Sequence, residues 1–137
     1  MKCFETPYLT VAYNSDLNAV LPAWRGYVQP SEAKTGFEKI LDIFCRFEAT
    51  FILNDLRDHE GGFHAVSNWL HDTYMPAMIA AGYAACANIV PLELLMHVSL
   101  NEFGDKQAGV VPLRVFTEME PAQNWIQTLQ HEWATSH

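Results

Sequence analysis

Two hydrophobic spacings alternate along the chain, and this alternation restricts the fold more than any other feature of the sequence. Short apolar runs lie at Phe51–Leu53, Ala84–Val90 and Leu113–Phe116. Between these runs, apolar residues recur every three or four positions, as they do on one face of an α-helix. Chains that alternate strands and helices usually form a mostly parallel sheet with right-handed crossovers. The sequence therefore predicts an α/β protein.

The N-terminal part predicts an antiparallel hairpin that joins the same sheet. Tyr8–Tyr13 alternates apolar and polar residues, Asn14–Asp16 supplies turn residues, and Ala19–Trp24 follows as a second strand. Pro22 argues against a central position for that strand, because proline cannot donate a ladder hydrogen bond. The expected order is β-β-α-β-α-β-α-β-α, with five strands in a single domain over residues 1–137.

The first helix is expected to begin near Pro30, with Ser31 as its N-cap. Gly36 should weaken this helix relative to alanine. Five apolar residues recur at helical spacing and are expected to face the sheet: Phe37, Ile40, Leu41, Phe44 and Cys45.

Three further helices follow the remaining strands. One should run from Phe63 to about Ala80, and Pro76 should kink or break it because proline lacks an amide hydrogen. Its inward residues are expected to be Phe63, Val66, Leu70 and Tyr74. The next helix ends at Gly104 and carries one apolar face: Leu92, Leu95, Met96, Leu100 and Phe103. The last begins near Thr117 or Glu120 and turns five residues inward: Ala122, Trp125, Ile126, Leu129 and Trp133.

Charge and cysteine usage exclude several classes of protein. The net charge is −8, and the 8 basic residues are scattered among 16 acidic ones. Nucleic acid and anionic membrane surfaces are therefore disfavoured as partners, since both require clustered positive charge. The three cysteines form neither a disulfide framework nor a zinc-binding spacing, and Cys45 and Cys86 are interpreted as small buried hydrophobic residues.

The sequence also predicts a cytoplasmic protein that does not insert into a membrane. Its first residues lack the apolar run of a signal peptide. The longest apolar stretch, Ala77–Ala87, is too short to span a bilayer.

Three segments resemble the STAS or SpoIIAA-like group, which is related to SEC14, and they are closest to a bacterial branch of it. The segments are Asp16–Leu21 with Trp24–Gly26, Leu53–Arg57, and Phe116–Ala122 before Trp125 and Ile126. The likeness extends from about Leu9 to Leu129. It implies a SpoIIAA-like fold and a non-enzymatic regulatory module that binds a protein partner or a second copy of itself as a homodimer. The SEC14-related alternative is a carrier of a small molecule or lipid, whose pocket would be lined by Trp69, Tyr74, Met75 and Met78.

One regulatory feature of the family is missing. In the partner-switching members, a serine after an aspartate is phosphorylated at the start of the helix that follows the third strand. The corresponding stretch here, Asp58–Phe63, contains no serine or threonine, and Ser67 falls inside the expected helix. A phosphate is stabilised at a helix N-terminus and not within the helix. This phosphorylation switch therefore does not carry over.

The polar loop expected at Asn54–Gly62 is the first candidate site, because ligands of α/β sheets bind beyond the carboxyl ends of the strands. Its candidate ligand- or partner-binding residues, together with a tryptophan of the next helix, are Asp55, Arg57, Asp58, His59 and Trp69. The structural alternative is that Asp55 or Asp58 caps the next helix and that Arg57 pairs with a carboxylate.

Metal or enzyme chemistry in the Asp58–His71 region is the third alternative. His59, His64 and His71 lie close in sequence, but His64 and His71 are about 10 Å apart along a helix. No nucleophile, phosphate loop or metal motif is present, so the histidines are expected to face solvent and no catalytic residue, metal ligand or cofactor is assigned.

Overall fold

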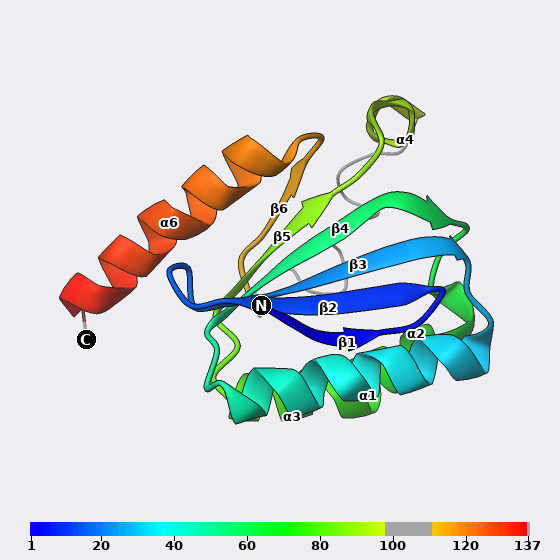
Figure 1. Cartoon of the computed structure of the whole chain (residues 1–137), viewed down its shortest axis with the longest axis horizontal. Helices are drawn as coiled ribbons and strands as arrows, with labels where there is room; N and C mark the ends of the chain where they lie inside the picture. The colour runs from blue at the N-terminus through cyan, green and yellow to red at the C-terminus, as the bar shows by residue number, and fades with distance from the viewer. Residues whose placement is uncertain (98–110, 137) are drawn as a thin grey trace.

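The computed structural model of the chain describes residues 1–97 and 111–136, which form a mixed sheet with helices on both faces (Figure 1). Within these residues the sheet has six strands in the order of the chain. They are β1 (Lys2–Glu5), β2 (Leu9–Asn14), β3 (Ala19–Tyr27), β4 (Phe51–Glu60), β5 (Ala85–Ile89) and β6 (Leu113–Phe116). The pairings β1–β2 and β2–β3 are antiparallel, and the other three are parallel. The α/β class and the N-terminal antiparallel hairpin are thereby confirmed.

The expectation of five strands is wrong, because β1 adds a sixth at the edge of the sheet. Its four residues have no apolar alternation that would mark a strand, and two of them are charged. The strand forms because the backbone groups of β2 that face away from β3 find partners in it, with Lys2 opposite Ala12 and Glu5 opposite Thr10. Pairing of this kind is a tertiary effect that local sequence does not carry.

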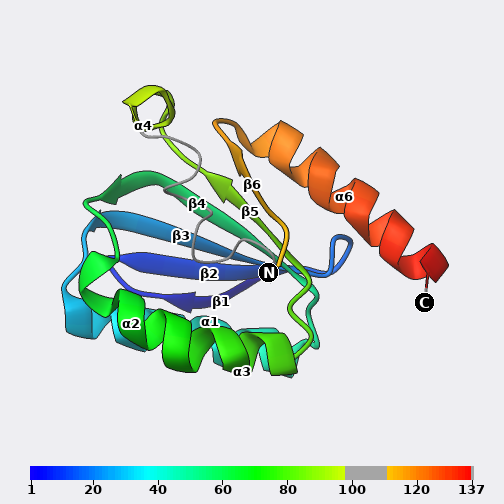
Figure 2. The same ribbon diagram turned by 180° about the vertical axis from the view of Figure 1, so that it is seen from behind.

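Helices cover the two faces of the sheet unequally (Figure 1, Figure 2). One face packs against α1 (Pro30–Arg46) and against a continuous helical segment. That segment consists of η1 (His64–Val66), α2 (Ser67–Trp69), η2 (Leu70–Tyr74) and α3 (Met75–Ala80). The opposite face packs against α6 (Met119–Ser136), and α4 (Leu92–His97) follows the carboxyl end of β5.

The start of α1 differs from the sequence prediction. Its N-cap is Gln29, and not Ser31, so the helix begins at Pro30. Proline suits this position because the first turn of a helix needs no intrahelical amide hydrogen. The Gln29 backbone N–H donates to the Glu32 carboxylate at 3.0 Å, which satisfies a group that the helix leaves unpaired.

The buried stripe of α1 is rotated relative to the predicted one. Its buried residues are Ala33, Gly36, Phe37, Ile40, Ile43 and Phe44. Cys45 is exposed and Leu41 is partly buried, so the prediction of a buried Cys45 is wrong. The stripe is centred on the Gly36–Ile40–Ile43 line, which turns Cys45 toward solvent.

The predicted helix at Phe63–Ala80 is confirmed in outline, and Pro76 does not break it. Leu70–Tyr74 forms a π-helical turn, and Pro76 lies in the first turn of α3 directly after it. A π turn interrupts the regular hydrogen-bond ladder at the point where proline cannot contribute to it. All four predicted inward residues belong to the core cluster on this face, Val66 and Tyr74 as buried and Phe63 and Leu70 as partly buried members.

The largest departure from the prediction is the length of β4. The sequence predicts a strand at Phe51–Leu53 and a loop from Asn54, whereas β4 continues to Glu60. The second half of β4 pairs with β3, with Arg25 opposite Asp58 and Tyr27 opposite Glu60. The register shifts in this half: between the pairs at Ala23 and Arg25, two residues of β4 oppose one residue of β3, as in a β-bulge.

The C-terminal elements agree closely with the prediction. β5 and β6 occupy the predicted positions, and α6 begins at Met119, between the two predicted start positions. Four of its predicted inward residues pack in the core cluster on this face: Ala122, Trp125, Ile126 and Leu129. The predicted inward position of Trp133 concerns a side chain outside the described part of the chain. The same holds for most of the apolar face predicted to end at Gly104, namely Leu95, Met96, Leu100 and Phe103.

Candidate functional site

The carboxyl ends of β3, β4, β5 and β6 lie along one edge of the sheet, because these strands run parallel. This edge, called the carboxyl edge below, carries the ends of β3 and β4, the start of α4 and the residues that precede α6 (Figure 1). Four of the five predicted site residues lie on the second half of β4, and Trp69 lies on α2.

Asp55 and Arg57 form a forked ion pair. Arg57 donates from Nη2 to Oδ2 of Asp55 at 2.8 Å and from Nε to Oδ1 at 3.0 Å, and its backbone N–H donates to Oδ1 at 3.1 Å. Burial raises the pKa of Asp55, but the hydrogen bonds and charge of Arg57 outweigh it and hold the pKa below its usual value. The pKa of Arg57 is raised, chiefly by the hydrogen bond to Asp55. The structural interpretation that Arg57 pairs with a carboxylate is thereby confirmed.

Neither aspartate caps the following helical segment. The N-cap of η1 is Phe63, and no side chain hydrogen-bonds there. Asp58 is exposed and lies opposite Arg25 in the register. Arg25 instead donates to the Thr6 carbonyl at 2.7 Å and to the Thr10 hydroxyl at 2.8 Å, and so ties β3 to the N-terminal strands.

His59 does not face solvent, contrary to the sequence expectation. Its ring stacks on Phe63, with centroids 4.5 Å apart and planes 12° apart, and lies 6.3 Å from the Trp24 ring. Both ring nitrogens are buried without a hydrogen-bond partner among the described residues. Burial lowers the pKa of His59, and the nearby Gly26 carbonyl and Glu60 carboxylate oppose this effect only in part.

Trp69 is partly buried and belongs to the opposite face from the Asp55–Arg57 pair. Lys34 places its ammonium 5.3 Å from the centroid of the Trp69 ring, and Tyr74 stacks on Trp69 at 6.0 Å. Phe37 connects this group to the aromatic rings around His59, with its centroid 4.9 Å from Phe63. The structure therefore divides the predicted residues between two faces of the sheet and does not gather them into one constellation.

Two residues of the predicted carrier pocket are packed in the core. Met78 has no exposed surface, and Tyr74 is 8% exposed. Burial raises the pKa of Tyr74 far above its usual value. In the described part of the chain, the helical segment packs these side chains directly against the sheet.

Exposed apolar residues at the carboxyl edge were not found from the sequence. Tyr27 at the end of β3 is 66% exposed, and Leu92 and Leu94 at the start of α4 are 57% and 39% exposed. Helical periodicity places Leu92 on the apolar face of the predicted helix, and its side chain is nevertheless exposed. Sequence position offered a signal, because Tyr27 ends a parallel strand and Leu92 and Leu94 lie within five residues of the end of another.

Two asparagines, also not predicted, lie side by side in the middle of the sheet. Asn54 of β4 and Asn88 of β5 are register partners, and they project to the face that α1 covers, as Ile52 and Cys86 do. Oδ1 of Asn54 is buried without a partner among the described residues. Oδ1 of Asn88 accepts a hydrogen bond from the Cys86 thiol at 3.3 Å.

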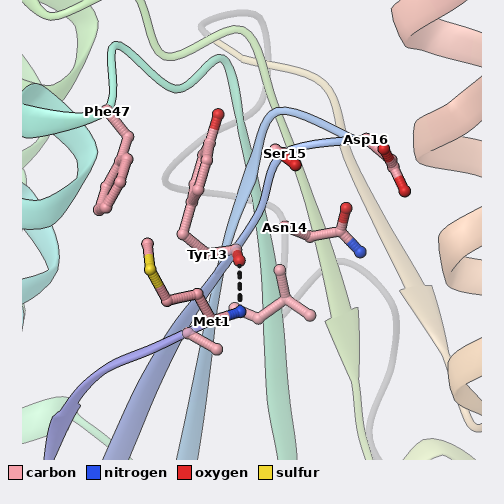
Figure 3. Close-up of a pocket in the computed structure, with 8 residues that line it drawn as sticks. Met1, Tyr13, Asn14, Ser15, Asp16 and Phe47 are labelled. Carbon is pink, nitrogen blue, oxygen red and sulfur yellow. Dashed lines mark hydrogen bonds between the residues drawn. The ribbon is translucent and has the colours of Figure 1, made fainter.

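An open pocket of about 580 Å³ lies at the opposite, amino edge of the parallel strands (Figure 3). Its walls include Tyr13 and Phe47, whose rings stack at 4.3 Å, and Met1, whose amino group donates to the Tyr13 carbonyl at 3.0 Å. Asn14, Ser15 and Asp16 form its polar side. The pocket contains none of the five predicted site residues.

Metal-ligating side chains do not converge in the part of the chain that the structure describes. Residues 1–97 and 111–136 hold no group of three or more histidine, cysteine, aspartate or glutamate side chains arranged to bind a metal ion. His71 contacts the carboxylate of Asp72 at 3.0 Å, on the exposed surface. None of the described helices is both long enough and apolar enough to span a bilayer.

The chain was also compared with known proteins. No family model matches it, and no curated protein matches it.

Proposed function

We propose that the protein is a non-enzymatic interaction module of SpoIIAA-like fold that binds a basic protein partner through its carboxyl edge. The observation that carries this proposal is the exposure of Tyr27, Leu92 and Leu94 at one edge of the sheet. Large apolar side chains that are exposed along one edge of a protein commonly mark a binding surface.

The charge around these residues specifies the kind of partner. Four exposed carboxylates lie at the carboxyl edge: Asp58, Glu60, Glu93 and Glu118. Two described basic residues lie beside these carboxylates, and both have partners: Arg57 is paired with Asp55, and Arg25 donates to Thr6 and Thr10. A surface with apolar centres and negative surroundings is complementary to a partner with an apolar, basic surface. The same negative field disfavours nucleic acid as the ligand.

Charge also weighs against self-association through this edge. Two copies of a chain with a net charge of −8 would bring two sets of carboxylates together in a symmetric dimer. Like charges placed opposite one another across an interface destabilise it. A different protein therefore suits the carboxyl edge better than a second copy does.

Regulation of this module differs from the phosphorylation switch of the partner-switching proteins that the chain resembles. The stretch Asp58–Phe63 offers no hydroxyl group. Ser67 is the nearest serine, and it lies inside the helical segment that begins at His64. A partner would therefore recognise the apolar and acidic groups themselves.

A second candidate function is the binding of a small neutral molecule, favoured by the Asn54–Asn88 pair. A buried amide oxygen without a partner is costly in a protein interior. A ligand that donates a hydrogen bond to Asn54 would remove this cost. This alternative corresponds to the SEC14-related function, but it places the ligand beside the two asparagines and not against Met78.

Affinity purification with matched surface variants tests the proposed function. The double variant Tyr27→Ser, Leu92→Ser removes two apolar groups at the carboxyl edge. Ile79→Ser is the control, because Ile79 is 42% exposed and lies near the end of α3, away from this edge. We expect one basic protein to be retained by the wild type and by Ile79→Ser, with at least about tenfold less recovered by the double variant.

Salt dependence completes this experiment. Raising the ionic strength should elute the partner from the wild-type protein, because screening weakens attraction between exposed charges. Equal recovery of the partner by the double variant would contradict the proposal. Recovery of only a second copy of the chain would contradict it as well.

A further inference from the structure

His59 lies in an aromatic cluster, and both of its ring nitrogens are buried without a hydrogen-bond partner among the described residues. Phe63 stacks on one face of the imidazole at 4.5 Å, and the Trp24 ring lies 6.3 Å away. Trp24 is 1% exposed, and its Nε1 is also buried without a partner among the described residues. The ring centroids of Trp24 and Phe63 are 4.9 Å apart, and Phe37 lies 4.9 Å from both.

We propose that His59 is a pH-sensitive latch, which holds the end of β4 against this aromatic cluster while the ring is neutral and releases it when the ring is protonated. The ring stacks on Phe63, and neither of its buried nitrogens has a hydrogen-bond partner among residues 1–97 and 111–136. This latch goes beyond the proposed function and stands independently of any partner.

Protonation would place a charge where the cluster cannot solvate it. A neutral imidazole has one N–H, whereas the protonated ring has two N–H donors and a full positive charge. Phe63, Phe37 and Trp24 offer no oxygen acceptor to these donors. Attraction between the cation and the Phe63 ring recovers only part of the lost hydration.

Charged and polar groups approach the His59 ring from several elements. On β4 itself, Glu60 is the charged residue whose carboxylate acts on His59, and it is exposed to solvent. From β3, the Gly26 carbonyl favours the protonated ring. From α1, the Lys34 ammonium lies over Trp69 and not over His59. On the segment that carries Phe63, the neighbouring His64 is exposed.

Release has a defined structural consequence. His59 pairs with Gly26 near the carboxyl ends of β3 and β4, and Tyr27 and Glu60 form the next pair. Three residues of β4 follow the register shift, and the pairing of β4 with β5 already ends at Asp55, so β3 is the neighbouring strand that holds this end. Movement of His59 out of the cluster would free the Asp58–Glu60 end and uncover Phe63 and Trp24.

NMR and hydrogen exchange on the full chain test this latch. The titration of His59 is followed by NMR through its ring protons between about pH 4.5 and pH 7.5. Hydrogen exchange of the amides of residues 51–66 is measured at about pH 4.5 and at about pH 7.5, and the rates are corrected for the intrinsic exchange rate at each pH. We expect the ring to titrate below the usual histidine range. The amides at the end of β4 should exchange at least about tenfold faster at the lower pH, relative to those of Phe51–Leu53.

Three variants separate the latch from general acid effects. His59→Phe and His59→Gln cannot titrate, so both should remove the pH-dependent opening even if one of them is less stable. His64→Gln removes an exposed histidine five residues away and should leave the opening unchanged. A His59 that titrates in the usual range would overturn the proposal. Equal protection at both pH values, or opening that persists in both His59 variants, would also overturn it.

Discussion

A Cβ atom built on Gly36 of α1 would lie only 2.6 Å from Cη2 of Trp24 on β3 and 2.9 Å from Cδ2 of Leu9 on β2. The helix therefore approaches the sheet so closely that only glycine fits between them. Sequence reasoning identifies the same glycine as a weakness of the helix, whereas in the structure it sets the distance between two layers.

The first prediction is that Gly36→Ala destabilises the protein by about 1–3 kcal/mol, because the added methyl group must displace the Trp24 ring. This loss exceeds the gain of up to about 1 kcal/mol in helix propensity. Urea unfolding measures the difference. Gly62→Ala is the control, since nothing lies within 4 Å of its Cβ position, and it should change stability by less than about 0.5 kcal/mol. A stabilised Gly36→Ala variant would show that the layers are not in close contact.

The second prediction concerns stability at mildly acidic pH. The pKa of folded His59 lies below the usual histidine value of about 6.5, so the unfolded chain binds more protons than the folded chain as the pH falls through that range. His59 therefore costs stability as the pH falls through about 6.5 and toward its folded pKa. His59→Phe should show a shallower loss of stability than the wild type over this range in urea titrations. Parallel curves for the two proteins would contradict the prediction.

The third prediction separates the cysteines by reactivity. Burial raises the pKa of the Cys86 thiol to about 12, and a hydrogen bond with Tyr83 only partly opposes this effect. Because the thiolate is the reactive form, Cys86 should resist a thiol reagent at about pH 8 until the protein unfolds. Cys45 is exposed and should react in the folded state. Mass spectrometry of labelled peptides provides the measurement, and equal labelling rates for Cys45 and Cys86 would contradict the expectation.

The fourth prediction is that the Asp55–Arg57 pair contributes little to stability at neutral pH. The Arg57 side chain is 42% exposed, so Arg57→Ala should cost less than about 1 kcal/mol. The pKa of Asp55 should rise in this variant, because burial then acts without the opposing hydrogen bonds. In the wild type, the lowered pKa of Asp55 stabilises the folded state above about pH 3.8, and this stabilisation is lost as the pH falls below that value. Arg57→Ala should lack this stabilisation at every pH. An unchanged Asp55 pKa, measured by NMR, would exclude Arg57 as its cause.

Much of the fold was predictable because burial imposes clear periodicities. β5 and β6, the start of α6 and the inward residues of the helical segment from Phe63 follow directly from apolar spacing. β1 and the second half of β4 were not predictable, since both consist largely of polar residues that become strands by pairing with a neighbour. Cys45 shows a related failure, because the rotation of a helix is fixed by what it packs against.

The candidate site was less predictable than the fold. Sequence order placed Asp55, Arg57, Asp58 and His59 in one loop, whereas they lie on a strand whose register shift between Asp55 and Asp58 moves His59 to the face opposite Asp55. The Asp55–Arg57 pair therefore lies away from His59, which joins the aromatic cluster of Trp24 and Phe63. That the ring nitrogens of His59 are buried depends on a stacking contact that no local pattern encodes.

Site-specific crosslinking tests the binding of a basic partner at the carboxyl edge most directly. A photoreactive amino acid replaces Leu92 in one protein and Ile79 in another, and both proteins are irradiated in cells of the source organism. We expect a crosslinked adduct with one basic protein when the photoreactive residue is at position 92, and no adduct when it is at position 79. An equal adduct from position 79, or adducts only with a second copy of the chain, would contradict it.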